Sequence, residues 1–169
     1  MKITLKKLKI ALHMSEETTA FTADIFVDGK EAGYAKNDGH GGSTFYHAYE
    51  GKRDLIAKAE KFCETLPDID YGTFKHKMDL ENFIDELVYA EMAKKEQAKL
   101  DKKFEKKMLT SILFGSPDKT GSYRELKFKV PLDKVPLDLL QKKVDFCKMN
   151  FKKGEVFWNT NLEKLGVKI

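Results

Sequence analysis

Apolar and polar residues alternate over the first fifty positions of the chain, the pattern typical of β-strands with one buried face. This alternation predicts four short strands, over residues 3–14, 21–27, 30–36 and 44–49. The dipeptide Asp28-Gly29, which separates the second and third strands, is a strong signal for a two-residue hairpin turn. The pattern therefore predicts a four-stranded antiparallel meander over residues 1–51.

One irregularity interrupts the alternation in the first strand. Ile3 and Leu5 lie on one face, and Leu8 then resumes the alternation one step out of phase and continues it to Met14. A slip of one residue would turn the later apolar side chains toward solvent. We therefore expect a β-bulge at the sequence KKL, which absorbs the extra residue.

The middle of the chain changes to a helical period. A first helix is predicted over residues 53–66, where Pro67 ends it. A connection leads to a second helix, which begins near Asp79 as a candidate N-cap. The apolar stripe of this helix thins from Lys94 to Lys107, so its second half can bury little surface.

The last third of the chain mixes both kinds of element. It contains a turn-rich loop at 115–122, a strand at 123–130, a helix at 136–153, a strand at 154–160 and a short helical turn at 161–167. Strands followed by helices and then by mixed elements predict an α+β fold.

We expect this fold to be a single domain over residues 1–169. In it, an antiparallel four-stranded meander (1–51) is packed by helices (52–110) and completed by a mixed region (111–169).

Composition agrees with a globular protein, because 41% of the 169 residues are apolar and 34% are charged. No apolar run approaches the roughly 20 residues of a transmembrane helix, and the N-terminus lacks the solid apolar block of a signal peptide. We therefore expect a cytoplasmic protein. Cys63 and Cys147 then fit reduced core thiols, and no cofactor is expected.

The net charge is +4, and 29 of the 31 basic residues are lysine, the exceptions being Arg53 and Arg124. Arginine provides the planar fork that reads base edges, whereas lysine is a mobile point charge. The composition therefore argues against a sequence-specific DNA-binding protein, while allowing nonspecific contact with phosphates.

The segment NDGHGGST, residues 37–44, holds three glycines and one histidine between two predicted strands, and we call it the glycine loop. Glycine tolerates positive φ, so Gly39, Gly41 and Gly42 can present successive N–H groups as an anion-binding nest. Asp38 and His40 add an acceptor and a titratable donor. The alternative is a plain hairpin loop. A Walker loop is excluded, since neither its lysine nor its helix follows.

A catalytic interpretation is also open. His40 or His47 could act as a general base oriented by Asp38 on a nucleotide or phosphoester. No nucleophile-elbow motif accompanies them, so an enzyme is the less favoured alternative. The same three side chains match no zinc spacing, and no metal is expected. His47 also fits an aromatic face with Phe45 and Tyr49.

A third interpretation is nonspecific nucleic-acid binding through a lysine-rich helix and the C-terminal region. The candidate residues are Lys102, Lys103, Lys106, Lys152 and Lys153. Near the C-terminus lysines alternate with aromatic residues, the mixture that holds single strands by charge and stacking. The alternatives are a solvated helix face for the first group and core aromatics for the second.

The N-terminal third resembles a family of uncharacterised small proteins encoded by phages, plasmids and their bacterial hosts. The resemblance rests on SEET at 15–18, Phe21, Ala23, the DGK turn at 28–30, and NDG with the following glycine pair in the glycine loop. It implies a biological setting and no reaction. It also implies that Glu16 and Glu17 belong with the glycine loop, as one rim of the sheet.

The sequence thus favours a non-enzymatic cytoplasmic binding protein. We expect it to recognise a phosphate-bearing ligand such as a nucleotide, or a bacterial defence protein of the host. The candidate ligand-binding residues are Glu16, Glu17, Asn37, Asp38, Gly39, His40, Gly41, Gly42 and Ser43.

Overall fold

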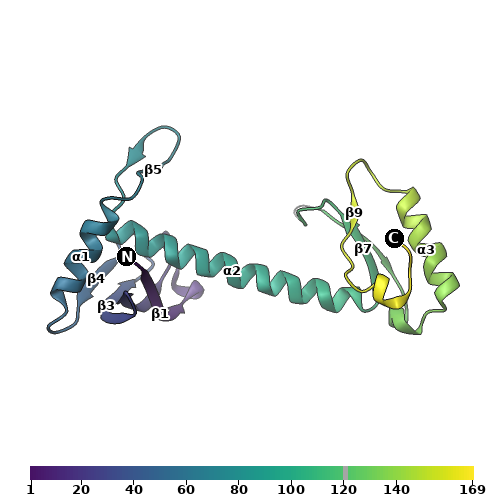
Figure 1. Cartoon of the computed structure of the whole chain (residues 1–169), viewed down its shortest axis with the longest axis horizontal. Coiled ribbons are helices and arrows are strands. Elements are labelled where there is room, and N and C mark those ends of the chain that lie inside the picture. Colours follow the sequence, from purple (N-terminus) through teal and green to yellow (C-terminus); the bar gives the residue numbers. More distant parts are fainter. Residues whose placement is uncertain (120–121) are drawn as a thin grey trace. The chain divides into compact units, whose positions relative to one another are not determined.

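The computed structural model describes residues 1–119 and 122–169 and is shown in Figure 1. The chain forms two compact units, Met1–Lys94 and Lys95–Ile169, which we call unit 1 and unit 2. A four-stranded antiparallel sheet at the N-terminus, three α-helices and a further sheet make the protein mixed α+β, as predicted. The expectation of one domain over residues 1–169 stays a prediction.

The sheet of unit 1 is the predicted meander. Its strands are β1 (Ile3–Ile10), β2 (Phe21–Val27), β3 (Lys30–Asn37) and β4 (Phe45–Ala48), in that order, and each neighbouring pair is antiparallel. The turn at positions 28 and 29 has positive φ at both residues, 47° and 79°. This is the backbone geometry that a two-residue hairpin of type I′ requires.

The predicted bulge is present in β1. The register with β2 shifts between Lys6 and Lys9, and Lys7 has a φ of 50°. Because of this extra residue, Leu5 and Leu8 both pack against the core although they are three positions apart. Lys6, Lys7 and Lys9 therefore lie on the other side of the sheet.

The first strand is shorter than predicted. It ends at Ile10, and Leu12–Met14 forms a short 3₁₀ helix. Leu12 is 62% exposed and Met14 48%, so neither continues the buried face. The alternation of apolar residues at these positions was therefore misleading, because the chain has already left the sheet.

Two helices cover one face of the unit 1 sheet. They are α1 (Arg53–Cys63) and the first part of α2 (Leu80–Met108). Asp79 caps α2 as predicted, since its carboxylate accepts the N–H of Asn82 at 2.8 Å. The buried side chains of this core come from β1, β2, β3, α1 and α2, and include Ile25, Ala35, Ala59, Leu80 and Ile84.

The connection between the two helices is more ordered than predicted. It holds a short antiparallel hairpin, β5 (Ile69–Asp70) and β6 (Lys75–His76). Tyr71 and Phe74 stack at its tip, with ring centroids 5.0 Å apart.

Unit 2 contains a three-stranded sheet in the order β8-β7-β9. Its strands are β7 (Ser111–Gly115), β8 (Arg124–Lys127) and β9 (Val156–Phe157), and α3 (Leu137–Met149) packs on them. The sequence did not reveal the central strand β7.

Other parts of unit 2 can be compared with the prediction. Short 3₁₀ helices lie at Leu132–Lys134 and Glu163–Leu165, the second where a helical turn was expected. Val130, the last residue of the strand predicted over 123–130, is 46% exposed, because β8 has ended before it. The predicted loop at 115–122 lies partly outside the described residues.

In the described part of the chain, none of the helices has the length and apolar character needed to cross a membrane.

Candidate functional site

The two loops expected to form one rim lie against each other. The carbonyl oxygen of Gly39 accepts the backbone N–H groups of Glu16, Glu17 and Thr18 at 2.9, 3.1 and 3.4 Å. The Nδ1 atom of His40 lies 3.1 Å from a carboxylate oxygen of Glu16. The glycine loop and the preceding SEET turn are therefore one structural element.

Asn37 is the centre of this element. Its Oδ1 accepts the hydroxyl of Thr18 and the N–H of Gly39, both at 2.8 Å. Its Nδ2 donates to the carbonyl of Gly42 at 2.9 Å and to the hydroxyl oxygen of Thr44 at 3.2 Å. Asn37 is 8% exposed, and a buried amide bonded in this way holds the loop in one conformation.

The N–H groups expected to form an anion nest are partly used inside the protein. The Gly39 N–H donates to Asn37, and the Gly41 N–H donates to the hydroxyl of Thr18 at 3.2 Å. An anion seated in the nest must therefore compete with these two bonds. That the glycine loop binds a ligand stays a prediction.

Positive φ accounts for two of the three glycines, and close packing against backbone adds to it at Gly39. Gly39 has a φ of +89°, and an added Cβ would collide with the Met14 carbonyl oxygen and reach Ala20 Cβ at 2.9 Å. Gly41 has a φ of +88°, and its Cβ would collide with the Glu17 carboxylate. Gly42 differs, because nothing lies within 4 Å of its added Cβ.

Thr44 fastens the end of the glycine loop to α2. Its N–H donates to Glu81 Oε1 at 2.9 Å, and its hydroxyl donates to Asp85 Oδ1 at 2.6 Å. Burial raises the pKa of the Asp85 carboxyl above its usual range; the Thr44 hydrogen bond opposes this shift, and nearby Glu81 adds to it.

This raised pKa predicts how pH changes stability. The favourable contribution of Asp85 is fully present below its ordinary pKa and is lost as pH rises through the raised folded value. Asp85→Asn keeps a carbonyl acceptor for Thr44 and removes the charge. We therefore expect Asp85→Asn to be more stable than wild type at pH 7, by a margin that shrinks as the pH falls toward about 4.

Urea unfolding at a series of pH values measures this difference. The exposed neighbour Glu86 supplies the control, since Glu86→Gln removes a charge from the same helix without touching Thr44. Equal pH dependence in wild type and Asp85→Asn would contradict the assignment.

The predicted acid–base residues have different partners. His40 faces Glu16, whereas Asp38 lies 3.6 Å from the Lys36 ammonium with its side chain 74% exposed. His47 lies on β4 and stacks on Phe45, with ring centroids 6.4 Å apart and planes 5° apart. Ser43 is exposed.

No three histidine, cysteine or carboxylate side chains come together as a metal-binding group within residues 1–119 and 122–169.

The predicted lysine patches lie in unit 2. Lys102, Lys103 and Lys106 are exposed on α2, and Lys152 and Lys153 are exposed after α3. Their binding role stays a prediction.

The aromatic residues near the C-terminal lysines belong mostly to the interior of unit 2. Trp158 is 2% exposed and donates its ring N–H to the Ser116 carbonyl at 2.9 Å. Phe151 and Phe157 are partly buried and pack against Phe114, whereas Phe146 is 54% exposed.

A surface that the sequence revealed only in part lies on the uncovered side of the unit 1 sheet. We call it the open face. Alternate residues of β2 point into the helix-covered core, so the residues between them and their cross-strand partners point the other way. The open face consists of Thr4, Lys6, Lys7, Lys9, Thr22, Asp24, Phe26, Glu31, Tyr34, Lys36, Phe45, His47 and Tyr49.

An aromatic cluster occupies the β3–β4 side of the open face. The ring centroid of Tyr34 lies 6.0 Å from that of Phe45, 6.1 Å from His47 and 6.1 Å from Tyr49. Phe45 is 49% exposed, His47 is exposed, and Tyr34 is half-buried. Folded proteins seldom leave several rings together in contact with water unless something binds there.

Lysines occupy the β1 side. Lys6 lies over the ring of Phe26, 4.0 Å from its centroid, and Lys7 pairs with Asp24 at 2.7 Å. Lys9 forms no ion pair with any residue that the structure describes. Lys36 lies on β3 next to the aromatic cluster. Mobile cations therefore flank the rings on the same surface.

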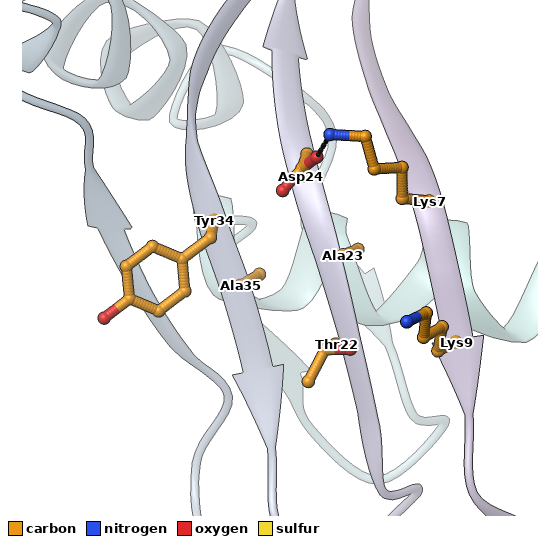
Figure 2. A pocket seen from close by; sticks show the side chains of 7 residues that line it. All are labelled: Lys7, Lys9, Thr22, Ala23, Asp24, Tyr34 and Ala35. Atoms are coloured by element: carbon orange, nitrogen blue, oxygen red, sulfur yellow. Dashed lines mark ion pairs between the residues drawn. The ribbon is translucent and has the colours of Figure 1, made fainter.

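A shallow pocket of about 210 Å³ lies between the two groups. Figure 2 shows the residues that line it, with Lys7 and Lys9 on one side, Thr22 and Asp24 on the middle strand, and Tyr34 on the far strand, where its ring points away from the lysines. Two alanines, Ala23 and Ala35, complete the lining.

Asp24 offsets part of the positive charge of this pocket by pairing with Lys7. The hydrogen bond from Lys7, followed by that from the Tyr49 hydroxyl, lowers the pKa of the Asp24 carboxyl. The same contact with Asp24 raises the pKa of Lys7, so this lysine stays protonated. Lys9 therefore provides positive charge that Asp24 does not neutralise, whereas Lys36 pairs with Asp38 at 3.6 Å.

The sequence contained a signal for this surface. The predicted aromatic face included His47 with its neighbours Phe45 and Tyr49. Tyr34 could also have been assigned to this face, because in KEAGYAK it alternates with the small residues at 33 and 35, which fit the opposite, buried face. The lysines could have been added from the predicted bulge in β1, which leaves Lys6, Lys7 and Lys9 on the face opposite Leu5 and Leu8.

Comparisons of the chain with family models, curated proteins and solved structures gave no match.

Proposed function

We propose that this protein is a non-enzymatic binding protein for a phosphate-bearing nucleotide ligand, and that the ligand binds on the open face of unit 1. The observation that carries the proposal is the pocket between Tyr34 and the lysines of β1. It pairs an aromatic surface, on which a base can stack, with ammonium groups that attract phosphate.

The chemistry of each side matches one part of a nucleotide. Stacking of a base on an aromatic ring contributes about 1–3 kcal/mol and tolerates any base, because every base has a π-face. Lys9, exposed and unpaired among the described residues, can approach a phosphate without first breaking an ion pair. Thr22, on the neighbouring strand, supplies a hydroxyl between the two.

The open face supports the proposal better than the glycine loop does. In the glycine loop, Gly39 and Gly41 already donate their N–H groups to Asn37 and Thr18. Among the described residues, no ion pair uses the ammonium of Lys9. Nothing observed favours a host defence protein as the partner, which stays a prediction from the resemblance.

Isothermal titration calorimetry with ATP at low salt tests the proposal. We expect binding by wild type and at least about a tenfold loss of affinity in Tyr34→Ala, because the stacking surface is removed. Tyr34→Phe keeps the ring and is expected to bind. Tyr71→Ala is the matched control, since Tyr71 is 55% exposed in the separate β5–β6 hairpin.

Two results would overturn the proposal. One is the absence of ATP binding in the folded wild type. The other is binding that survives Tyr34→Ala but is lost in His40→Ala, which would place the site at the glycine loop.

A further inference from the structure

Resting on the proposed function, we infer that the natural ligand of the open face is single-stranded nucleic acid rather than a free nucleotide. The inference rests on the extent of the surface. One ring and one cation are enough to bind a single nucleotide. The open face carries several of each, on the same side of one sheet.

The aromatic side chains repeat along the sheet. Phe45, His47 and Tyr49 follow one another at alternate positions of β4 and the residue after it, and Tyr34 contacts all three rings from β3. Alternate residues of a strand are about 6.6–6.8 Å apart. A row of rings at this repeat offers successive stacking surfaces to successive bases.

The positive charge also repeats. Lys6, Lys7 and Lys9 lie along β1, and Lys36 lies next to the aromatic cluster. The bulge places Lys6 and Lys7 side by side without turning Leu8 out of the core. Lys7 and Lys36 already pair with Asp24 and Asp38. Among the described residues, Lys6 and Lys9 can therefore contact successive phosphates without displacing a carboxylate, while the bases reach the rings.

The same surface argues against a duplex. The bases of a duplex are already stacked on one another, so exposed rings bring no advantage until the strands separate. Neither of the two arginines, Arg53 on α1 and Arg124 on β8, lies on the open face, so nothing there reads base edges with a bidentate fork. We therefore expect binding that depends on single-strandedness and is indifferent to sequence.

Fluorescence anisotropy on the full chain tests this inference. The probes are labelled oligothymidylates of about 4 and about 10 nucleotides, thymidine monophosphate as competitor, and the longer strand annealed to oligodeoxyadenylate. We expect the longer strand to bind at least about tenfold more tightly than the monophosphate and the duplex.

Variants locate the binding surface. Phe45→Ala and Tyr34→Ala are each expected to weaken binding of the longer strand about tenfold. Contact with about three phosphates predicts a slope of about −2 in log K against log salt concentration, and Lys9→Ala should flatten it by about 0.7. Lys58→Ala, the same change at an exposed position of α1, is expected to leave both quantities unchanged. Melting curves confirm folding, and Phe45, 49% exposed, is the safer of the two aromatic sites.

The outcomes separate the two proposals. Equal affinity for monophosphate and longer strand overturns the single-strand inference and leaves the proposed function intact. Absence of binding to ATP and to every strand overturns both and points to a protein partner. Binding lost in Lys102→Ala and Lys103→Ala but kept in Phe45→Ala overturns the assigned surface.

Discussion

Replacing Gly39 by alanine is expected to lower the free energy of unfolding of unit 1 by about 3 kcal/mol. The φ of +89° disfavours any residue with a Cβ, and that atom would also collide with the backbone carbonyl of Met14. Backbone cannot move aside as a long side chain can. A shift of Gly39 would weaken two sets of hydrogen bonds together. Its carbonyl accepts the N–H groups of residues 16–18, and its own N–H donates to Asn37.

Gly42→Ala is the matched control for this change. Gly42 lies in the same loop, and nothing lies within 4 Å of its added Cβ. We expect it to change stability by no more than about 0.5 kcal/mol. Urea unfolding followed by far-ultraviolet circular dichroism measures both variants. Equal losses in the two would show that the contacts of Gly39 are not what constrains the loop.

The second large effect is expected at Asn159, in unit 2. Its Oδ1 accepts the N–H of Leu113 at 2.6 Å, and its Nδ2 donates to the Ser111 carbonyl at 2.9 Å. Asn159 is 6% exposed, and both partners belong to the buried strand β7. The amide therefore continues the pairing of β7 where β9 has ended.

Asn159→Ala leaves two buried backbone groups of β7 without this partner. Each unsatisfied group costs about 1–3 kcal/mol, so we expect a loss of about 3 kcal/mol. Trp158, the one tryptophan of the chain, is buried beside it and reports unfolding of unit 2 by fluorescence.

Asn150→Ala is the control for Asn159→Ala. Asn150 is exposed, and its side-chain amide donates to the Phe146 carbonyl in the last turn of α3 at 2.7 Å. We expect a loss of about 1 kcal/mol or less there. A similar small loss in Asn159→Ala would contradict the role of its amide in completing the sheet.

The part of the fold around Asn159 could not be predicted from the sequence. The meander of unit 1 could be predicted because its signals are local: alternation, a hairpin dipeptide and a phase shift in β1. The strand β7 could not, because SILFG is buried on both sides and has no alternation to reveal it. Its partners lie before and after α3, and one of them is a side-chain amide.

The candidate site was likewise predictable only in part. Contact between the SEET turn and the glycine loop was expected from the resemblance, together with the order of strands in the meander. The use of the Gly39 and Gly41 amides by Asn37 and Thr18 could not be foreseen, because it depends on side-chain directions within the loop. The open face needed cross-strand register, which brings Tyr34 beside His47 and Lys9 beside Thr22.

The central claim is that the open face of unit 1 is the binding surface, and nuclear magnetic resonance of the ¹⁵N-labelled chain titrated with ATP tests it most directly. We predict the largest amide shifts at Thr22, Tyr34, Lys36 and His47, with small shifts at Gly39 and Gly41. Large shifts confined to the glycine loop, or to the lysine-bearing helix of unit 2, would contradict it.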